Sequence, residues 1–350
     1  MRDVAVLAGV SLSTVSRVIN DEPTVAEEFV SRVRRAAAQL NYQHNLAASE
    51  LRRRVGPPST IGLLIQDVSN QFSASIFRSV EDYAHKQRVS VLASNVDEDP
   101  DRERQLVATL ISRRVSGLII VPAAQDQSYL QSEQRSGTPI VFLDRPPRLL
   151  AADNVLSDNL DGSLKGVLHL VRHGHRRIGY LGETSTHMPA NLRHAGYVEA
   201  LRRSRIRLDG SIVKRDLRSE EDARAACIAI LTDAEPPTAL FAAHNRLTVG
   251  AIQALRSLGL ERRTAIVGFD DFELADMLQP AVSVVAQDPV EIGRLGAEIL
   301  FRRMSGDDSP VREHVVATRF ITRGSGEIRR DAEPGGTRPR IGNSKNASAR

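Results

Sequence analysis

The sequence has a single cysteine, no tryptophan and only 4% aromatic residues. Cys227 has no second cysteine with which to form an internal disulfide or a thiolate metal site. It lies in an alanine-rich stretch with a helical pattern, residues 223–231, so we expect a buried thiol. No run approaches the roughly 18 apolar residues of a membrane helix, and no apolar stretch follows the start of the chain. We therefore expect a cytoplasmic protein with neither a membrane span nor a secretory signal.

Motifs of enzyme chemistry are also missing. The sequence has no Walker-type phosphate loop, dinucleotide glycine fingerprint, paired-histidine zinc motif or Gly-x-Ser-x-Gly elbow. His173 and His175 lie in a short basic turn, where we expect them to be solvated, because no cysteine or carboxylate completes a ligand set. We predict no catalytic residue, no metal and no cofactor, and hence a protein other than an enzyme.

The net charge of +4 is concentrated at the two ends of the chain. Residues 1–60 hold eight Lys or Arg against six Asp or Glu, and residues 329–350 hold six against two. The remaining residues are slightly acidic, with 33 basic and 35 acidic side chains. Most of the chain therefore has no general attraction to polyanions, and we expect nucleic-acid contacts to come from the first sixty residues.

From about residue 61 the sequence alternates short apolar runs with helical patterns. This alternation is typical of a parallel sheet built from strand-helix-strand units. One helix is predicted from about 70 to 87 by a stripe of Phe72, Ile76, Val80 and Tyr83, and a second by Leu106, Leu110 and Ile111. The predicted strands are 61–66, 89–94, 117–122, 139–144, 177–182, 239–243 and 265–269.

Several of these strands end in polar residues. Ligands of open parallel sheets bind beyond the carboxyl ends of the strands, where loops and helix N-termini converge. Any one such residue is more simply explained as a helix cap or turn residue, but the whole set favours a ligand cleft. The set is Gln66, Asp67, Asp144, His244, Asn245, Asp270 and Asp271.

The first forty residues have the pattern of a helix-turn-helix. Residues 2–8 form a short apolar-faced helix, Gly9 to Ser11 form a tight turn, and Ser11 can cap a second helix whose inner face is Val15, Val18 and Ile19. Such a second helix fits a DNA major groove. A generic three-helix unit is the alternative, but the small outward residues and Arg17 favour DNA.

A third helix is expected after the break at residues 20–23. Thr24 and Glu27 have the spacing of a capping box. Its packing residues are predicted to be Val25, Phe29, Val33, Ala36 and Leu40.

These residues carry a family resemblance. The runs 3–5, 7–11 and 13–20, with Asn41, Tyr42, Asn45 and Leu51, resemble the DNA-binding headpiece of the LacI/GalR (lac repressor/galactose repressor) family. The resemblance continues through the core and ends about 25 residues before the last residue. It rests there on residues 61–63, 69–70, 115–119, 158–159, 174–178, 193, 196–197, 267–271 and 287.

The resemblance implies an all-α helix-turn-helix headpiece followed by an α/β two-lobed periplasmic-binding-protein-like core, with parallel sheets in Rossmann-like lobes. It implies a transcription regulator, usually a repressor, that binds a pseudo-palindromic operator as a homodimer and a small effector between the lobes. The implied domains are a headpiece at 1–44, a hinge helix and linker at 45–60, a core at 61–328 and a disordered basic tail at 329–350.

Residues matching the family motif are the candidate DNA contacts. In the headpiece Leu12, Ser13 and Arg17 match base-reading positions, whereas Thr14, Ser16 and Asn20 are better suited to phosphates or flanking positions. The hinge helix, which in the family becomes ordered when the protein binds DNA, supplies four further candidate DNA contacts. Leu51 stands at the position of the leucine wedge that kinks the minor groove, although a plain linker residue is the alternative. The others are Asn45, Ala48 and Arg52.

Candidate effector contacts follow from the same match. Carboxylates and a guanidinium in a cleft suit the hydroxyls of a sugar-like effector. Arg193 could instead bind a carboxylate or phosphate bidentately, or form a surface ion pair. The candidates are Asn70, Phe72, Asp144, Arg193, Leu217, His244, Asn245, Asp270 and Gln287.

The sequence departs from the family pattern at several positions. His244 replaces the usual first residue of an Asn-Asp pair, and Leu217 stands where an aromatic residue often stacks on a sugar. We therefore expect a carbohydrate or a derivative without naming one. Met1 directly precedes the first helix, so a misassigned start is possible and weaker DNA binding is expected if it is the true start. Residues 331–350 lack a leucine heptad, which favours a dimer over a tetramer.

Overall fold

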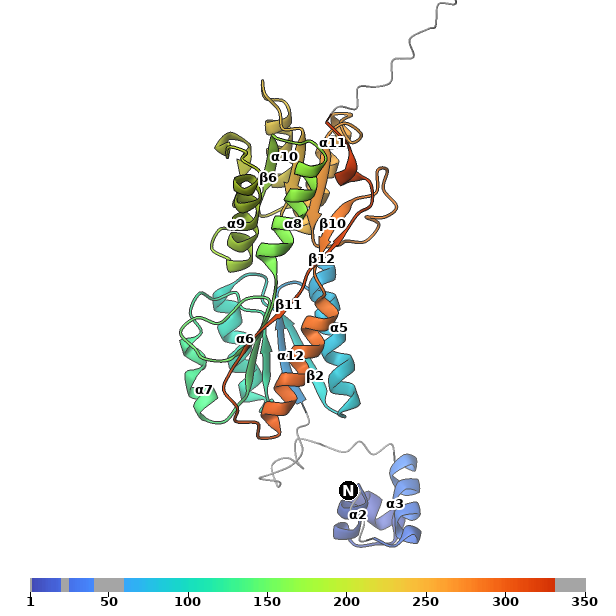
Figure 1. Cartoon of the computed structure of the whole chain (residues 1–350). Helices are drawn as coiled ribbons and strands as arrows, with labels where there is room; N and C mark the ends of the chain where they lie inside the picture. Colours follow the sequence, from blue (N-terminus) through green and yellow to red (C-terminus); the bar gives the residue numbers. More distant parts are fainter. Residues whose placement is uncertain (1, 20–24, 41–59, 331–350) are drawn as a thin grey trace, which may run out of the picture. The chain divides into compact units, whose positions relative to one another are not determined.

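The computed structural model describes residues 2–19, 25–40 and 60–330 (Figure 1). The chain divides into two compact units, residues 1–57 and 58–350, which we call the headpiece and the core. Among the described residues, no helix is both long enough and apolar enough to cross a membrane. The predictions for Asn20, Thr24, Asn45, Ala48, Leu51, Arg52 and the tail lie outside the described residues.

The headpiece contains three helices: α1 (Arg2–Ala8), α2 (Leu12–Ile19) and α3 (Glu27–Gln39). The first two agree with the sequence prediction. Val4, Val15 and Val33, one from each helix, are fully buried and form the centre of its small core. Between α1 and α2, Gly9 has a φ of +60°, and an added Cβ would lie 2.6 Å from Nη2 of Arg32. The tight turn therefore requires glycine at this position.

The third headpiece helix differs from its prediction. Its N-cap is Ala26, whose side chain makes no capping hydrogen bond, so Glu27 is the first helical residue and not the third, as the predicted capping box requires; the Thr24 half of that box lies outside the described residues. Phe29 and Leu40 are exposed, at 37% and 44% of their surface, instead of packing on the other helices. The Arg32 guanidinium lies 5.7 Å from the centre of the Phe29 ring, so this ring packs against a surface side chain.

The core consists of two lobes, each a six-stranded sheet between helices (Figure 1). We call them the N-lobe and the C-lobe. The N-lobe sheet has the order β11-β5-β4-β3-β1-β2 and is parallel throughout. The N-lobe elements are β1 (Thr60–Ile65), α5 (Gln71–Lys86), β2 (Ser90–Asn95), α6 (Pro100–Ser112), β3 (Leu118–Ile120), η1 (Ser128–Leu130), α7 (Gln131–Arg135), β4 (Ile140–Leu143), β5 (Asp153–Ser157), α12 (Pro289–Met304) and β11 (Glu313–Val316).

The C-lobe sheet has the order β12-β10-β9-β8-β6-β7, and only its edge strand β12 is antiparallel. The chain passes between the lobes at residues 157–159, 286–289 and 316–319. The C-lobe elements are α8 (Asn159–Arg172), β6 (Ile178–Leu181), α9 (Met188–Arg203), η2 (Gly210–Ile212), β7 (Val213–Lys214), α10 (Glu220–Leu231), β8 (Ala239–Ala242), α11 (Asn245–Ser257), β9 (Ala265–Phe269), β10 (Ser283–Ala286), β12 (Arg319–Ile321) and η3 (Ser325–Glu327).

Both faces of each sheet are buried, which explains the continuous apolar strands. In β1, Ile61, Leu63 and Ile65 contact α5 and α12, whereas Leu64 contacts the α6 side. Paired helices approach closely at glycine: a Cβ on Gly196 in α9 would lie 2.4 Å from the backbone oxygen of Leu160 in α8. All seven predicted strands are present within about two residues, together with five that were not predicted.

Cys227 and His175, both discussed from the sequence, are buried in the C-lobe. Cys227 is inaccessible within α10, as expected, and burial raises the pKa of its thiol to about 12. The expectation of a solvated His175 is wrong. Its Nδ1 lies 3.0 Å from Oγ1 of Thr238 and its Nε2 2.7 Å from the carbonyl oxygen of Ile328, so this ring ties the C-terminal segment to the sheet.

Candidate functional site

Helix α2 presents the side chains predicted to read DNA, Leu12 and Ser13 in its first turn and Arg17 in its last. Oγ of Ser11 accepts a hydrogen bond from the Thr14 amide at 3.1 Å, which confirms the predicted cap. Leu12, with 44% of its surface exposed, Ser13 and Arg17 are on the outside of the headpiece. Thr14 and Ser16 are half-buried. The arrangement leaves a helix N-terminus lined with small and apolar side chains, as major-groove binding requires.

A cavity of about 610 Å³ lies between the two lobes of the core. Its walls come from the carboxyl ends of β1, β3 and β4 in the N-lobe and of β6, β8 and β9 in the C-lobe. This is the edge at which the sequence predicted a cleft. The walls include eight of the nine predicted effector residues, namely Asn70, Phe72, Asp144, Arg193, Leu217, His244, Asp270 and Gln287.

The ninth predicted residue, Asn245, does not line the cavity. It is buried at the first position of α11, where its side chain exchanges hydrogen bonds of 3.2 and 3.3 Å with the Asn70 amide. Beside this pair, Arg246 of the C-lobe forms an ion pair with Asp67 of the N-lobe. These two contacts join the lobes directly, so Asn245 is placed to hold the lobes together rather than to touch a ligand.

Two aspartates occupy equivalent places in the two lobes. Asp144 follows β4 and Asp270 follows β9, both with positive φ, of 64° and 70°, and both nearly buried. Oδ1 of Asp270 accepts a 2.5 Å hydrogen bond from Nε2 of Gln287, whose own Oε1 is buried with no partner among the described residues. Burial raises the pKa of Asp144. The pair gives the cavity one carboxylate from each lobe.

Arg193 of α9 is 3% exposed, which rules out the surface ion pair considered from the sequence. Its Nε donates to Oδ1 of Asn159 at 2.8 Å and its Nη1 to the carbonyl oxygen of Ala243 at 2.9 Å. Nη1 also lies 3.6 Å from Oδ2 of Asp270, and the guanidinium stacks 4.0 Å from the centre of the Phe269 ring. Its position is therefore fixed before any ligand enters.

His244 is the N-cap of α11 and lines the cavity. Its Nδ1 accepts a hydrogen bond from the Arg246 amide at 3.3 Å, and its Nε2 lies 3.6 Å from Glu183. Burial lowers the pKa of His244 to about 4. The imidazole is therefore neutral at pH 7 and offers one donor and one acceptor.

Sequence reasoning missed seven charged or titratable residues of this cavity: Asp97, Arg218, Arg246 and the four that follow. Glu98 follows β2, and both its oxygens accept from the Arg145 fork at 2.6 and 2.7 Å. Glu183 follows β6, where burial raises the pKa of its carboxyl. His187 is the N-cap of α9, with Nε2 3.4 Å from Glu98 across the lobe boundary. Of these four, only Arg145 had a signal in the sequence, because it directly follows Asp144 at a strand end.

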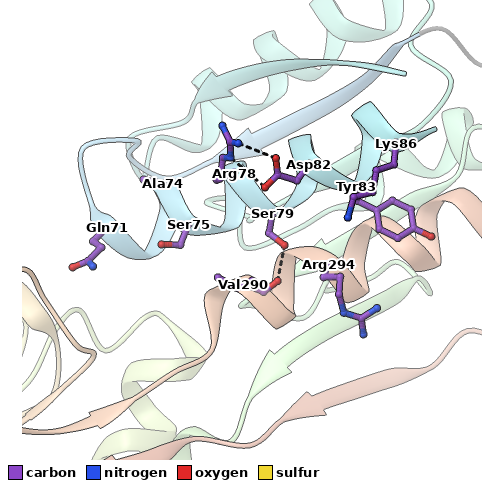
Figure 2. A pocket seen from close by; sticks show the side chains of 10 residues that line it. All are labelled: Gln71, Ala74, Ser75, Arg78, Ser79, Asp82, Tyr83, Lys86, Val290 and Arg294. Carbon is purple, nitrogen blue, oxygen red and sulfur yellow. Dashed lines mark hydrogen bonds and ion pairs between the residues drawn. The ribbon is translucent and has the colours of Figure 1, made fainter. Parts of the chain in front are cut away.

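A second hollow, of about 460 Å³, lies between α5 and α12 on the surface of the N-lobe (Figure 2). Both its arginines pair with neighbours on their own helices: Arg78 with Asp82 at 3.1 Å, and Arg294 with Glu291 at 2.7 Å. Ser79 donates to the Val290 carbonyl at 2.6 Å. The hollow has no buried charge that a ligand would satisfy, so it is a weaker candidate than the cavity between the lobes.

A helix-turn-helix unit joined to a two-lobed core with a polar internal cavity defines a ligand-responsive transcription regulator. Comparison with known proteins agrees. Residues 1–45 match the bacterial regulatory proteins of the lacI family, and residues 167–326 match the periplasmic binding protein-like domain. The ribose operon repressor of Haemophilus influenzae strain KW20 / Rd is 32% identical over 327 residues, which span 93% of this chain and 98% of that protein. This chain therefore belongs to the lacI family.

Two further comparisons support the same class. The transcriptional repressor PurR of H. influenzae strain PittEE is 30% identical over 318 residues, covering 90% of this chain and 94% of that protein. A crystal structure of the lac repressor dimer bound to operator and the anti-inducer ONPF superposes with a TM-score of 0.82 at 28% identity, covering 93% of this chain and 98% of that one. The predicted fold class is confirmed, and the class of protein is a DNA-binding repressor rather than an enzyme.

Proposed function

We propose that this protein represses transcription as a homodimer on a pseudo-palindromic operator, under the control of an uncharged polyhydroxyl effector, sugar-like in chemistry, bound in the interlobe cavity. The DNA contacts are Leu12, Ser13, Thr14, Ser16 and Arg17 of α2, with Asn20 and the hinge residues named above. The observation that carries the choice of effector is that Arg145 and Arg193 each already direct two of their three guanidinium nitrogens to protein groups.

Two of the three guanidinium nitrogens of Arg193 already donate to protein groups, which disfavours a bidentate clamp on an anion. A phosphate or carboxylate is held best by two parallel N–H groups of one guanidinium. Asn159 and the Ala243 carbonyl take Nε and Nη1 of Arg193, and Asp270 lies close to the same Nη1. Nη2 makes no such contact and is the nitrogen best placed for a ligand oxygen, whereas the second N–H of Nη1 lies on the nitrogen that is 3.6 Å from the Asp270 carboxylate.

Arg145 is committed in the same way. Its Nη1 and Nη2 donate to the two oxygens of Glu98, and Nη1 also donates to the Pro122 carbonyl at 3.0 Å. Burial alone would raise the pKa of Glu98, but the hydrogen bonds and charge of Arg145 lower it, so the pair stays ionised. Nε of Arg145 is buried without a hydrogen bond, 3.6 Å from Asp144. It can donate to one ligand oxygen.

The balance of charge in the cavity also opposes an anion. Six carboxylates and four guanidinium groups line it, and both histidines have a pKa lowered by burial. An anion in this cavity would be desolvated beside carboxyl groups that outnumber the guanidinium groups, at a cost of several kcal/mol. Hydroxyl groups, in contrast, donate to Asp144, Asp270 and the unpartnered Oε1 of Gln287. Phe72 is the only phenyl ring of the lining, so flat aromatic ligands find little to stack on.

Calorimetric titration with matched pairs of ligands tests this proposal. Ribose, glucose and galactose should be compared with ribose 5-phosphate, glucose 6-phosphate and gluconate, with adenine and guanine as non-sugar ligands. At least one neutral sugar should bind, and its phosphorylated form at least about tenfold more weakly. Tighter binding of a phosphorylated sugar, or binding of a purine and of no sugar, would contradict the proposal.

The variant Glu98→Gln sharpens the same test, because it releases the Arg145 fork from a carboxylate. The preference for neutral over phosphorylated sugar should narrow in this variant. Glu291→Gln is the matched control, because it disturbs an exposed arginine pair outside the cavity. An unchanged preference in both variants would contradict the role assigned to the Arg145 fork.

The dimer is tested separately by sedimentation of the full chain on a 30-base-pair duplex carrying the selected operator. Two chains per duplex are expected, because a two-fold protein matches a palindromic site. A saturated complex with one chain per duplex would contradict it.

A further inference from the structure

Six exposed arginines lie at the end of the C-lobe sheet that is opposite the cavity. The cavity residues follow the carboxyl ends of β6, β8 and β9, whereas these arginines lie before β6, after α9 and at the end of the described chain. We call them the arginine patch: Arg172, Arg176, Arg205, Arg207, Arg329 and Arg330.

Contacts between backbone segments bring the patch together. The turn at 172–177 touches the segment after α9, because Nη1 of Arg176 reaches the Ser204 carbonyl at 3.4 Å and Arg177 pairs with Asp209. The same turn touches the C-terminal segment, since a Cβ on Gly174 would lie 3.9 Å from Cβ of Arg330. Three segments that are far apart in sequence thus present their arginines side by side.

The positive charge of the patch is not neutralised within the protein. Across residues 60–330, none of the six arginines forms an ion pair, whereas neighbouring Arg202 and Arg203 are both paired with Glu199. Of the nearby carboxylates, Asp209 is engaged by Arg177, and Glu327 by His169 and Ser283. Glu235, whose carbonyl accepts from Arg177, is the exposed carboxylate that remains beside the patch.

Stabilisation by a helix C-terminus, a common reason for a surface arginine, accounts for only one residue of the arginine patch. Cations are favoured in the last turn of a helix, where the macrodipole is negative, and Arg172 is the final residue of α8. The other five lie in loops after α9, before β6 and after η3. The patch therefore gathers positive charge that, apart from the Arg172 helix end and the Arg176 bond to Ser204, no internal partner offsets, and a polyanionic partner would offset this repulsion.

We propose that the arginine patch binds the phosphate backbone of duplex DNA without sequence preference, as a second DNA-binding surface separate from the headpiece. Guanidinium groups pair with phosphates bidentately, and the patch carries six of them on one surface. The sequence after residue 330 adds four basic and two acidic residues, so the positive charge continues along the chain. DNA is the polyanion that a chain of this family necessarily meets, which favours it over an acidic protein.

Salt-dependent titration of the full chain tests the proposal. Anisotropy of a labelled 20-base-pair duplex without operator sequence is measured for wild type, for Arg176→Gln with Arg205→Gln, Arg207→Gln and Arg330→Gln, and for a control. The control replaces four exposed, unpaired arginines elsewhere, namely Arg135, Arg224, Arg256 and Arg312, by Gln. Any headpiece contribution is shared by all three proteins, so the differences report the patch.

The slope of log affinity against log salt falls by about 0.9 for each phosphate that the protein no longer neutralises. The slope of the patch variant should therefore be smaller than that of wild type by about 3 to 4, and the slope of the control by less than 1. If the fourfold variant unfolds, Arg205→Gln and Arg330→Gln alone should each reduce the slope by about 0.9. Photo-crosslinking of an iodouracil-substituted duplex to wild type should in addition label peptides containing residues 172–176, 203–207 or 328–330.

Two results would overturn the proposal. Equal slopes for wild type, patch variant and control would show that the patch does not touch DNA. Patch-dependent binding of a 20-residue poly-glutamate, without any crosslink of the duplex to the three segments, would assign the surface to an acidic protein instead.

Discussion

The headpiece and the interlobe cavity both bring polar side chains toward a partner, but they do so in opposite ways. In the headpiece, three fully buried valines form the centre of the core while Leu12, Ser13 and Arg17 stand outside it. In the cavity, Arg193, Asp144 and Asp270 are themselves buried, so recognition and stability depend on the same side chains. The headpiece therefore separates function from stability, whereas the cavity couples them.

The largest expected effect is that of Arg193→Ala. The change leaves Asp270 without its guanidinium and Asn159 and the Ala243 carbonyl without a donor, which costs about 3 to 5 kcal/mol of unfolding free energy and abolishes effector binding. Arg202→Ala on the same helix is the control, because that side chain is 72% exposed and should cost under about 0.5 kcal/mol. Urea unfolding measures both, and similar losses in the two variants would break the comparison.

A smaller effect is expected from His244→Asn as the pH is lowered. The pKa of His244 is about 4 in the folded protein and 6.5 in the unfolded chain, so the unfolded chain binds the proton first as the pH falls. Wild type should therefore lose up to about 3 kcal/mol between pH 6.5 and pH 4 that the asparagine variant keeps. Asparagine can still cap α11. Parallel stability profiles of the two proteins from pH 7 to pH 4 would contradict the buried neutral imidazole.

The smallest effect on stability is expected from Leu12→Ala in the headpiece. This side chain is already 44% exposed, so the free energy of unfolding should change by less than about 0.5 kcal/mol. Operator affinity should nevertheless fall about tenfold, because the variant makes less apolar contact with base edges. Anisotropy on the selected operator measures the affinity and thermal unfolding measures the stability. A large loss of stability would show that Leu12 belongs to the headpiece core.

The same contrast explains how much could be predicted from the sequence. The first two headpiece helices and the Ser11 cap are set by neighbours within four residues, and both were predicted. The polar residues that follow the carboxyl ends of the strands also predicted the position of the cleft. A parallel sheet binds ligands at this end whatever the order of its strands, so the strand order did not have to be known. Short edge strands such as β11 and β12, which have four and three residues, begin with charged side chains and have no fully buried residue, gave too weak a pattern to be found.

What could not be predicted depends on contacts between distant residues. Glu98 and Arg145 are 47 positions apart, and nothing in the sequence around either residue indicates that each carboxylate oxygen of Glu98 accepts from an N–H of Arg145. Asn245 matched a ligand position but is satisfied by Asn70, 175 positions away. His175 was expected to be solvated because its own turn is basic, yet Thr238 and Ile328 bury it. These contacts form only when distant parts of the chain have folded together, so the local sequence around each residue does not predict them.

The central claim, that an uncharged polyhydroxyl effector controls DNA binding, is tested most directly on the operator itself. The operator is first selected from genomic fragments by the full chain, and its affinity is then measured at one salt concentration with a neutral sugar identified by calorimetry and with its phosphorylated form. The account predicts a change of about tenfold or more with the neutral sugar and none with the phosphate. A change produced by the phosphorylated sugar alone would contradict it.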